Sequence, residues 1–434
     1  MDKKEITEVF EISEKTKKIF DKKLKNISEI KKVLEGQDET NITSFLEILF
    51  LAALIIDASD IHIESLENKA KIRFRIDGVL QDVIFINAQL YQKTLSRIKL
   101  LSGLKLNVEN RAQDGRFSIL FNVKEKIEIR TSTLPSEEGE SIVMRILNPK
   151  NIIGIEQLGL RGDLLKTFNE QIKKPFGMIV VTGPTGSGKT TTLYAFLKKI
   201  LNPDIKIITI EDPIEYHLEG ISQTQVESER GYTFDSGLRA IMRQDPDVIL
   251  VGEIRDLETS NTAVQASLTG HLVLTTLHTN DAAGAVARFV DLGVRPVSLS
   301  PALRMIVAQR LIRKVCPKCS TQRQITKDEL SLFKKELTGL KINNMPKIDA
   351  KTKISEAKGC EECNLTGYKG RVGIFEVLTM DDELEKLIFE KASGLEIKKA
   401  AEKRGMVSLY QDGLIKILEN KTTLDEVERV ASQR

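Results

Sequence analysis

Hydrophobic residues change their spacing along the chain, and the spacing predicts two different folds in succession. Between residues 44 and 148, a helix that begins near Ser44 precedes segments in which apolar and polar positions alternate, as in half-buried strands. The segments are AKIRFRIDGVLQDVIF, RFSILFNVKEKIEIRTSTL and SIVMRIL. The turn sequences DG and EEGE separate alternating runs. The pattern predicts a small α+β domain of hairpins over residues 44–148.

Further along the chain, short runs of consecutive apolar residues replace the alternation. The run MIVV is followed by IKIITI, DVILV and HLVLTT, with helical segments between them. Strands of this kind that alternate with helices are typical of a mostly parallel sheet with helices on both faces. We therefore expect an α/β fold with such a sheet over residues 177–315. Ligands of these sheets bind at the carboxyl ends of the strands.

The other segments complete the expected organisation. Residues 1–43 are rich in Lys and Glu and predict a short helical segment to which no function can be assigned. The remaining expectations are a linker with a helix at 149–176, a cysteine-bearing lobe at 316–370 and a helical region at 371–434.

Charge and hydropathy exclude some classes of protein. The 65 basic and 62 acidic residues give a net charge of +3, whereas nucleic-acid binding usually shows a clustered basic excess. The apolar stretch ILFLAALII at 48–56 is about half a bilayer span, which favours a core helix over a membrane anchor. The first residues, MDKKEITEVF, lack the apolar core of a signal peptide. We expect a cytosolic chain that contacts a membrane only through a partner.

A phosphate-binding loop lies between the first of these strands and a helix predicted from Lys189 to Ile200. Its sequence fits G-x-x-x-x-G-K-[ST], in which backbone N–H groups hold phosphates, the lysine reaches the β- and γ-phosphates and the Thr190 hydroxyl binds Mg²⁺. A glycine turn without a ligand is the alternative. The expected ATP-binding residues are Gly183, Pro184, Thr185, Gly186, Ser187, Gly188, Lys189, Thr190 and Thr191.

Acidic residues and histidines flank the later strands. Glu211 and Asp212 follow one strand, and Glu253 follows another. Because Mg²⁺ needs carboxylate ligands and an attacking water needs a base, Glu211 and Glu253 suit both roles, and spacing does not decide which residue has which. A solvated helix cap is the alternative for each acidic residue alone.

His278 follows a third strand, and His271 stands at the start of that strand. The imidazole of His278 is suited to sense the γ-phosphate, and a polar core histidine is the equal alternative. Arg130 and Arg145 lie on hairpin strands of the first domain and are candidates for arginine fingers. Surface or edge positions are the alternative for these two arginines.

All four cysteines fall into two C-x-x-C pairs, Cys316 with Cys319 and Cys360 with Cys363. In a reducing compartment this arrangement favours a tetrahedral zinc ion over disulfides. A redox pair and unrelated thiols are the alternatives. Four thiolates leave no open position for catalysis, so the predicted role of the zinc is structural.

Several motifs in order resemble the secretion ATPases of type II secretion and type IV pilus assembly. They are ASDIHIE, RIDGVL, QDGRF, STLPSEEGE, GPTGSGKTTTLY, EDPIEY, RQDPDVILVGEIRD, TGHLVLTTLHTND, QRLIRKVCPKC and RVGIFEVL. The resemblance runs from about Ser44 to the C-terminus.

The resemblance implies a RecA-like phosphate-loop core with an inserted zinc lobe, in a homohexameric ring at the inner face of the cytoplasmic membrane. ATP hydrolysis would move domains and act on an inner-membrane platform protein. EDPIEY resembles the family's Asp box, with Glu211 near Mg²⁺ and water and with Asp212 beside it, and VILVGEIRD resembles its Walker B segment with Glu253. His271 and His278 match its His box, and Arg130 and Arg145 match arginines that reach nucleotide between subunits.

Within this family, a tetracysteine element is typical of the assembly and secretion branches and not of retraction motors, which favours assembly of a pilus or secretion pseudopilus.

Many members carry a folded N-terminal domain, and about 40 residues precede the matching region here. Recruitment is therefore expected to differ, or the domain to be reduced to a helix pair. The alternatives are a competence pseudopilus motor, a DNA-translocating or conjugation-type ATPase, and a nucleotide switch without hydrolysis. The cargo and the system served are not encoded in these motifs.

Overall fold

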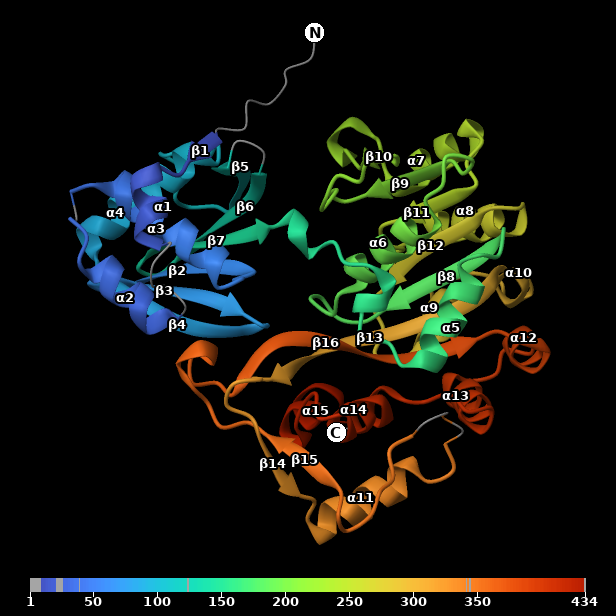
Figure 1. Ribbon diagram of the computed structural model, residues 1–434. Coiled ribbons are helices and arrows are strands. Elements are labelled where there is room, and N and C mark those ends of the chain that lie inside the picture. The colour runs from blue at the N-terminus through green and yellow to red at the C-terminus, as the bar shows by residue number, and fades with distance from the viewer. Residues whose placement is uncertain are drawn as a thin grey trace. The chain divides into compact units, whose positions relative to one another are not determined.

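The chain divides into two compact units, each built around its own seven-stranded sheet (Figure 1). The computed structural model describes residues 9–20, 26–38, 40–122, 125–340, 342 and 345–432. Unit 1 comprises residues 1–150, 316–319 and 358–369, and unit 2 comprises residues 151–315, 320–357 and 370–434. The cysteine-bearing segment 316–370 is therefore shared between the units. Parts of the expected domains lie outside the described residues, namely residues 1–8, 21–25, 39, 123, 124, 341, 343, 344, 433 and 434.

The sheet of unit 1 is antiparallel except at one edge, where β1 runs parallel to β5. In sheet order its strands are β1 (Val9–Glu11), β5 (Gln113–Asn122), β6 (Glu125–Ser136), β7 (Gly139–Leu147), β2 (Asp60–Leu66), β3 (Lys69–Ile76) and β4 (Val79–Asn87). Asp77 and Gly78 join β3 to β4 with φ of 50° and 83°, the left-handed backbone that a tight hairpin requires. The DG sequence thus forms the predicted turn.

Helices α1 (Glu14–Phe20), α2 (Ile27–Glu35), α3 (Ile42–Ile55) and α4 (Ala88–Leu101) belong to unit 1. Residues 45–53 of α3 are all buried, so the apolar stretch ILFLAALII lies in a core helix. In the described part of the chain, every helix is too short or too polar to cross a membrane.

The segment before α3 packs into the core of unit 1. The ring of Phe10 meets the ring of Phe50 edge to face, with centroids 5.3 Å apart. The Ser13 hydroxyl donates to the buried carboxylate of Glu47 at 2.6 Å, and the Thr16 hydroxyl donates to the same oxygen. Residues 9–20 are therefore an integral layer of this unit.

The sheet of unit 2 carries the parallel strands that the apolar runs predict. In sheet order they are β10 (Ser222–Gln225), β9 (Ile207–Glu211), β11 (Val248–Val251), β12 (Leu272–Leu277), β8 (Gly177–Thr182), β13 (Leu303–Val315) and β16 (Tyr368–Thr379). The pairs from β10 to β13 are parallel. Strand β16 lies beyond β13, so part of the expected C-terminal helical region belongs to this sheet.

Helices cover both faces of this sheet (Figure 1). Alternate residues of β8 enter two different cores: Met178 and Val180 pack with α7 to α10, and Ile179 and Val181 pack with α5 and α6. The helices are α5 (Gly162–Gln171), α6 (Lys189–Ile200), α7 (Phe234–Ile241), α8 (Leu257–Leu268), α9 (Ala282–Asp291), α10 (Pro296–Ala302), α11 (Lys327–Leu337), α12 (Asp382–Phe389), α13 (Gly394–Lys403), α14 (Leu409–Leu418) and α15 (Leu424–Ala431). A separate hairpin sheet consists of β14 (Thr321–Gln324) and β15 (Lys353–Glu356).

Candidate active site and metal centre

The phosphate loop connects the end of β8 to the first residue of α6. Gly183 and Gly188 have φ of 153° and 88°, conformations that side chains rarely adopt. The Lys189 Nζ donates to the carbonyl oxygens of Gly183 and Pro184 at 2.8 and 3.2 Å, so the lysine folds over the loop. Thr190 and Thr191 are partly buried in the first turn of α6. The N–H groups of a helix N-terminus that follows such a loop form a site for phosphate.

The remaining loop residues differ in exposure. Pro184, Thr185 and Gly186 are exposed, whereas Ser187 is buried. The Ser187 Oγ has no hydrogen-bond partner among the described residues. Burial lowers the pKa of Lys189 to about 8, against the opposing charge of Glu253. The ammonium group of Lys189 is therefore partly desolvated.

Three neighbouring parallel strands bring functional candidates to their carboxyl ends, where the phosphate loop also lies. Glu253 follows β11 and His278 follows β12, and a Glu253 carboxylate oxygen lies 3.6 Å from the His278 Nε2. The other oxygen of Glu253 accepts from the Arg255 guanidinium at 2.5 Å. Burial and the charge of Lys189 lower the pKa of His278. Glu253, His278 and Lys189 thus form one polar cluster.

Glu211 ends β9 and is surrounded by hydrogen-bond donors. One carboxylate oxygen accepts from the Tyr194 hydroxyl at 2.5 Å. The other accepts from the Thr209 hydroxyl at 2.6 Å and from the Gln223 amide at 3.2 Å. Glu211 is only 4% exposed, and its neighbour Asp212 is exposed. The network fixes Glu211 between α6 and the sheet.

His271 lies at the opposite end of the strands from the phosphate loop. It precedes β12, and its Nδ1 lies 2.9 Å from the carbonyl oxygen of Ala266. The six residues of β12 separate it from His278, which is roughly 20 Å along an extended strand. The structure does not bring His271 to the phosphate loop of its own chain.

In unit 1, the two predicted arginines stand in one row across the sheet. Arg130 is paired with Arg145, Arg116 with Arg130, and Asp60 with both Arg145 and Arg75. Directly opposed residues share a face, and like charges there are destabilising. Asp60 lies 3.1 Å from the Arg145 guanidinium and 3.6 Å from that of Arg75. Arg130 in turn lies 3.3 Å from a Glu128 carboxylate oxygen, so carboxylates accompany this row of arginines.

Several further residues take part in these sites. Gln309 on β13 contacts the phosphate loop, and Tyr194 on α6 contacts Glu211. Arg116 and Arg75 extend the arginine row. The signals for Gln309 are its place at the start of the motif QRLIRKVCPKC and its place after the buried run from Met305 to Ala308. The local sequence does not show that this run pairs with β8.

The four cysteines form one cluster, as the two C-x-x-C pairs predict. The Sγ atoms of Cys316 and Cys360 are 3.9 Å apart, those of Cys319 and Cys363 are 3.8 Å apart, and all four lie within 4.8 Å of one another. Tetrahedral zinc–sulfur bonds of about 2.3 Å place sulfurs about 3.8 Å apart. The backbone N–H groups of Cys360 and Gly367 donate to the Cys363 sulfur at 3.2 and 3.3 Å. The donor set therefore fits a structural zinc ion.

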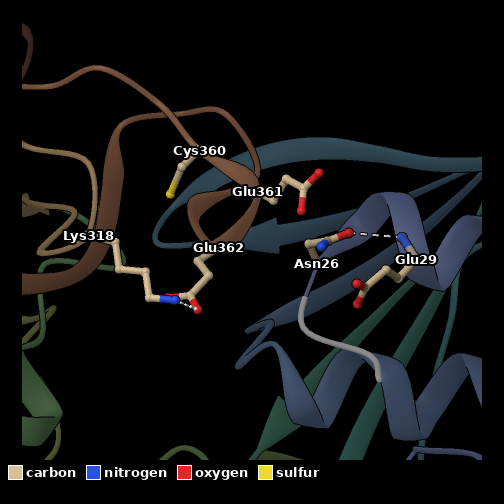
Figure 2. Close-up of a pocket in the computed structure, with 6 residues that line it drawn as sticks. All are labelled: Asn26, Glu29, Lys318, Cys360, Glu361 and Glu362. Atoms are coloured by element: carbon tan, nitrogen blue, oxygen red, sulfur yellow. Dashed lines mark hydrogen bonds and ion pairs between the residues drawn. The ribbon is translucent and has the colours of Figure 1, made fainter. Parts of the chain in front are cut away.

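The cysteine cluster belongs to unit 1, where its second loop faces α2 (Figure 2). Glu361 and Glu362 line a pocket together with Asn26 and Glu29 of the α2 N-terminus. Lys318, between the first two cysteines, pairs with Glu362. The two cysteine loops are thereby joined by a charge pair, and their thiols lie close together.

Residues 35–429 match the sequence model of a family described as type II/IV secretion system protein. The chain belongs to this family. It is 43% identical over 402 residues to type II secretion system protein E of Aeromonas hydrophila, covering 92% of this chain and 78% of the relative. It is 42% identical over 391 residues to the type IV pilus assembly ATPase PilB of Thermus thermophilus, covering 90% of this chain and 43% of the relative.

A solved structure agrees with this family assignment. The pilus retraction motor PilT with bound ADP resembles the chain with a TM-score of 0.58 at 28% identity, covering 88% of this chain and 95% of that chain. The family, the fold class and the ATPase activity expected from the sequence are confirmed.

Proposed function

We propose that this ATPase works as a homohexameric ring that drives assembly of a type IV pilus or a type II secretion pseudopilus through an inner-membrane platform protein. The names of its relatives, a type II secretion protein and a type IV pilus assembly ATPase, support this function. The cysteine cluster supports assembly over retraction, because the resemblance associates that element with the assembly branch. The protein would act in the cytoplasm and reach the membrane through the platform.

The cluster of Glu253 with Lys189 and His278 is the observation that supports the chemistry. The triphosphate would lie on the phosphate loop, with Lys189 at the β- and γ-phosphates. Glu253 stands at the end of β11 within reach of His278, which is the placement expected of the base that orients and deprotonates the attacking water. We therefore assign the base to Glu253 and a positioning role to Glu211, whose two oxygens already accept three hydrogen bonds.

The Thr190 hydroxyl and the carboxylates at the strand ends are oxygen donors of the kind that Mg²⁺ prefers. When bound, Mg²⁺ supplies positive charge that stabilises the phosphates in the transition state. Positive charge would also come from Arg130 and Arg145 of a neighbouring subunit. The two guanidinium groups oppose each other on neighbouring strands, so together they would present a concentrated positive charge to a phosphate.

Replacing Glu253 with Gln tests the assignment. We expect the rate of ATP hydrolysis to fall at least about a hundredfold, because a general base contributes about 10²- to 10⁴-fold. ATP binding, measured by fluorescence with a nucleotide analogue, should persist. Glu258→Gln, an exposed position in the first turn of α8, is the matched control and should hydrolyse ATP normally. Equal turnover by the Glu253 variant would remove Glu253 from the chemistry.

Light scattering in the presence of a slowly hydrolysed ATP analogue tests the ring. We expect a particle near six times the chain mass of 48.7 kDa. A monomer at all concentrations would contradict a ring that forms without the platform.

A further inference from the structure

Strand β13 brings one amide side chain against the phosphate loop. Ala308 of β13 is paired with Thr182, the last residue of β8. Gln309 is the next residue, so it lies beside Gly183, where the loop begins. Its side chain is 2% exposed and is therefore closed off from solvent.

Both ends of this amide are hydrogen-bonded, and the two partners lie on either side of Lys189. The Gln309 Nε2 donates to the carbonyl oxygen of Ser187 at 2.8 Å. The Thr192 hydroxyl donates to the Gln309 Oε1 at 2.7 Å. Ser187 belongs to the loop and Thr192 to the first turn of α6. One buried side chain thus ties the loop to the helix that carries the lysine.

Gln309 also explains the close packing at two glycines of the loop. A Cβ on Gly183 would lie 2.5 Å from the carbonyl oxygen of Gln309, and a Cβ on Gly188 would lie 2.8 Å from its Nε2. Both distances are shorter than any real contact of a Cβ atom. The loop therefore rests directly on Gln309 at its first and last glycine.

We propose that Gln309 is a positioning residue for ATP binding, which holds the phosphate loop in the conformation that offers its N–H groups to the phosphates. The side chain contacts no substrate and acts through Ser187 and Thr192. The inference rests on the proposed ATP site. A loop without this support would have to be ordered by the nucleotide, and part of the binding free energy would be lost in that step.

One replacement removes both hydrogen bonds, and another removes only the bond to Thr192. Gln309→Met keeps the length of the side chain and removes both bonds. Thr192→Val removes one bond, and Thr192→Ser keeps the hydroxyl. We expect the dissociation constants of ATP and ADP to rise roughly tenfold in Gln309→Met and Thr192→Val, about the effect of losing a buried hydrogen bond. Thr192→Ser should bind like the unmodified protein.

Steady-state kinetics separates positioning from a general loss of structure. Loss of loop order before binding should raise KM about as much as the dissociation constant and leave kcat within about twofold. The double variant should be little worse than Gln309→Met, because Gln309→Met already removes the bond that Thr192→Val removes. Gln265→Met, an exposed position on α8, is the matched control and should change neither constant.

Unchanged dissociation constants and KM in Gln309→Met would overturn the inference, as would fully additive effects in the double variant. If Gln309→Met fails to fold, the comparison of Thr192→Val with Thr192→Ser gives the same decision. The binding measurement needs no hydrolysis. An unmodified protein that binds ATP without hydrolysing it would therefore count against the proposed function alone.

Discussion

The Asn364 side chain accepts a hydrogen bond from the backbone N–H of Ile27 at 2.8 Å, although 337 residues separate the two in sequence. Ile27 is the first residue of α2, and Asn26 caps the same helix end by accepting from the Glu29 N–H at 2.9 Å. Asn364 directly follows Cys363 and has φ of 52°. One of the two caps of α2 is therefore held in place by the cysteine cluster, within unit 1.

Removing the metal should therefore loosen α2. We expect chelation, or Cys363→Ser, to speed hydrogen exchange of the amides of residues 27–35, because Asn364 loses its fixed position. Asn364→Ala should have a smaller effect of the same sign, equivalent to the roughly 0.5–2 kcal/mol of a helix cap. Asn68→Ala, exposed in the turn between β2 and β3, is the control. Absence of zinc from the purified protein in metal analysis would contradict the premise.

Tyr194 should stabilise the fold through Glu211. Its hydroxyl donates to a carboxylate that is almost fully buried. We expect Tyr194→Phe to lower the free energy of unfolding by about 1–3 kcal/mol, since one buried acceptor loses its donor. Denaturant unfolding measures this change. Tyr410→Phe, at a partly exposed tyrosine, is the matched control and should stay within about 0.5 kcal/mol of the unmodified protein.

Arg130 and Arg145 should act on the nucleotide of a neighbouring subunit. We expect Arg130→Ala or Arg145→Ala to lower kcat by roughly 10- to 1,000-fold, in the direction known for arginine fingers. Lys126→Ala removes a charge from β6, the strand that carries Arg130, and should leave kcat nearly unchanged.

Mixing subunits tests whether the arginine acts between chains. A mixture of the Arg130→Ala and Glu253→Gln variants should hydrolyse ATP faster than the sum of the two separate proteins. Some interfaces of the mixed ring would combine an intact Glu253 with an intact Arg130. No gain on mixing would place the arginine and the nucleotide in the same chain.

Glu376 should make the stability of unit 2 depend on pH. Burial raises the pKa of Glu376 although the Ala282 N–H donates to its carboxylate at 2.8 Å. Asp281 raises that pKa further and Lys398 lowers it, and Arg310 also acts on it by charge. A carboxyl with a raised pKa favours the folded state at low pH, and this contribution is lost as pH rises through the folded-state pKa.

A Glu376→Gln variant stays neutral and lacks this pH dependence. We expect the melting temperature of Glu376→Gln minus that of the unmodified protein to increase as pH rises from about 5 to 7.5. Glu361→Gln, at an exposed glutamate, should show no such trend. A difference that stays constant over this pH range would refute the role of Glu376.

Much of the fold was predictable because its signals are local. The Asp77–Gly78 turn, the loop from Gly183 to Lys189 and the buried helix α3 each depend on residues close together in sequence. Glu253 and His278 were predicted to meet because each follows a parallel strand of one sheet. The family resemblance placed His271 with His278 in the His box, whereas the two residues stand at opposite ends of β12.

The sequence by itself determined the motifs, the strand and helix periods and the four cysteines, since these need only local spacing. Tertiary structure alone decided that Arg116, Arg130 and Arg145 align, because strand register sets which residues oppose one another. Tertiary structure alone also surrounded the Glu211 carboxylate with hydrogen-bond donors and placed Gln309 against the phosphate loop. These contacts join segments far apart in the chain, and their geometry arises only when both sheets close around their cores.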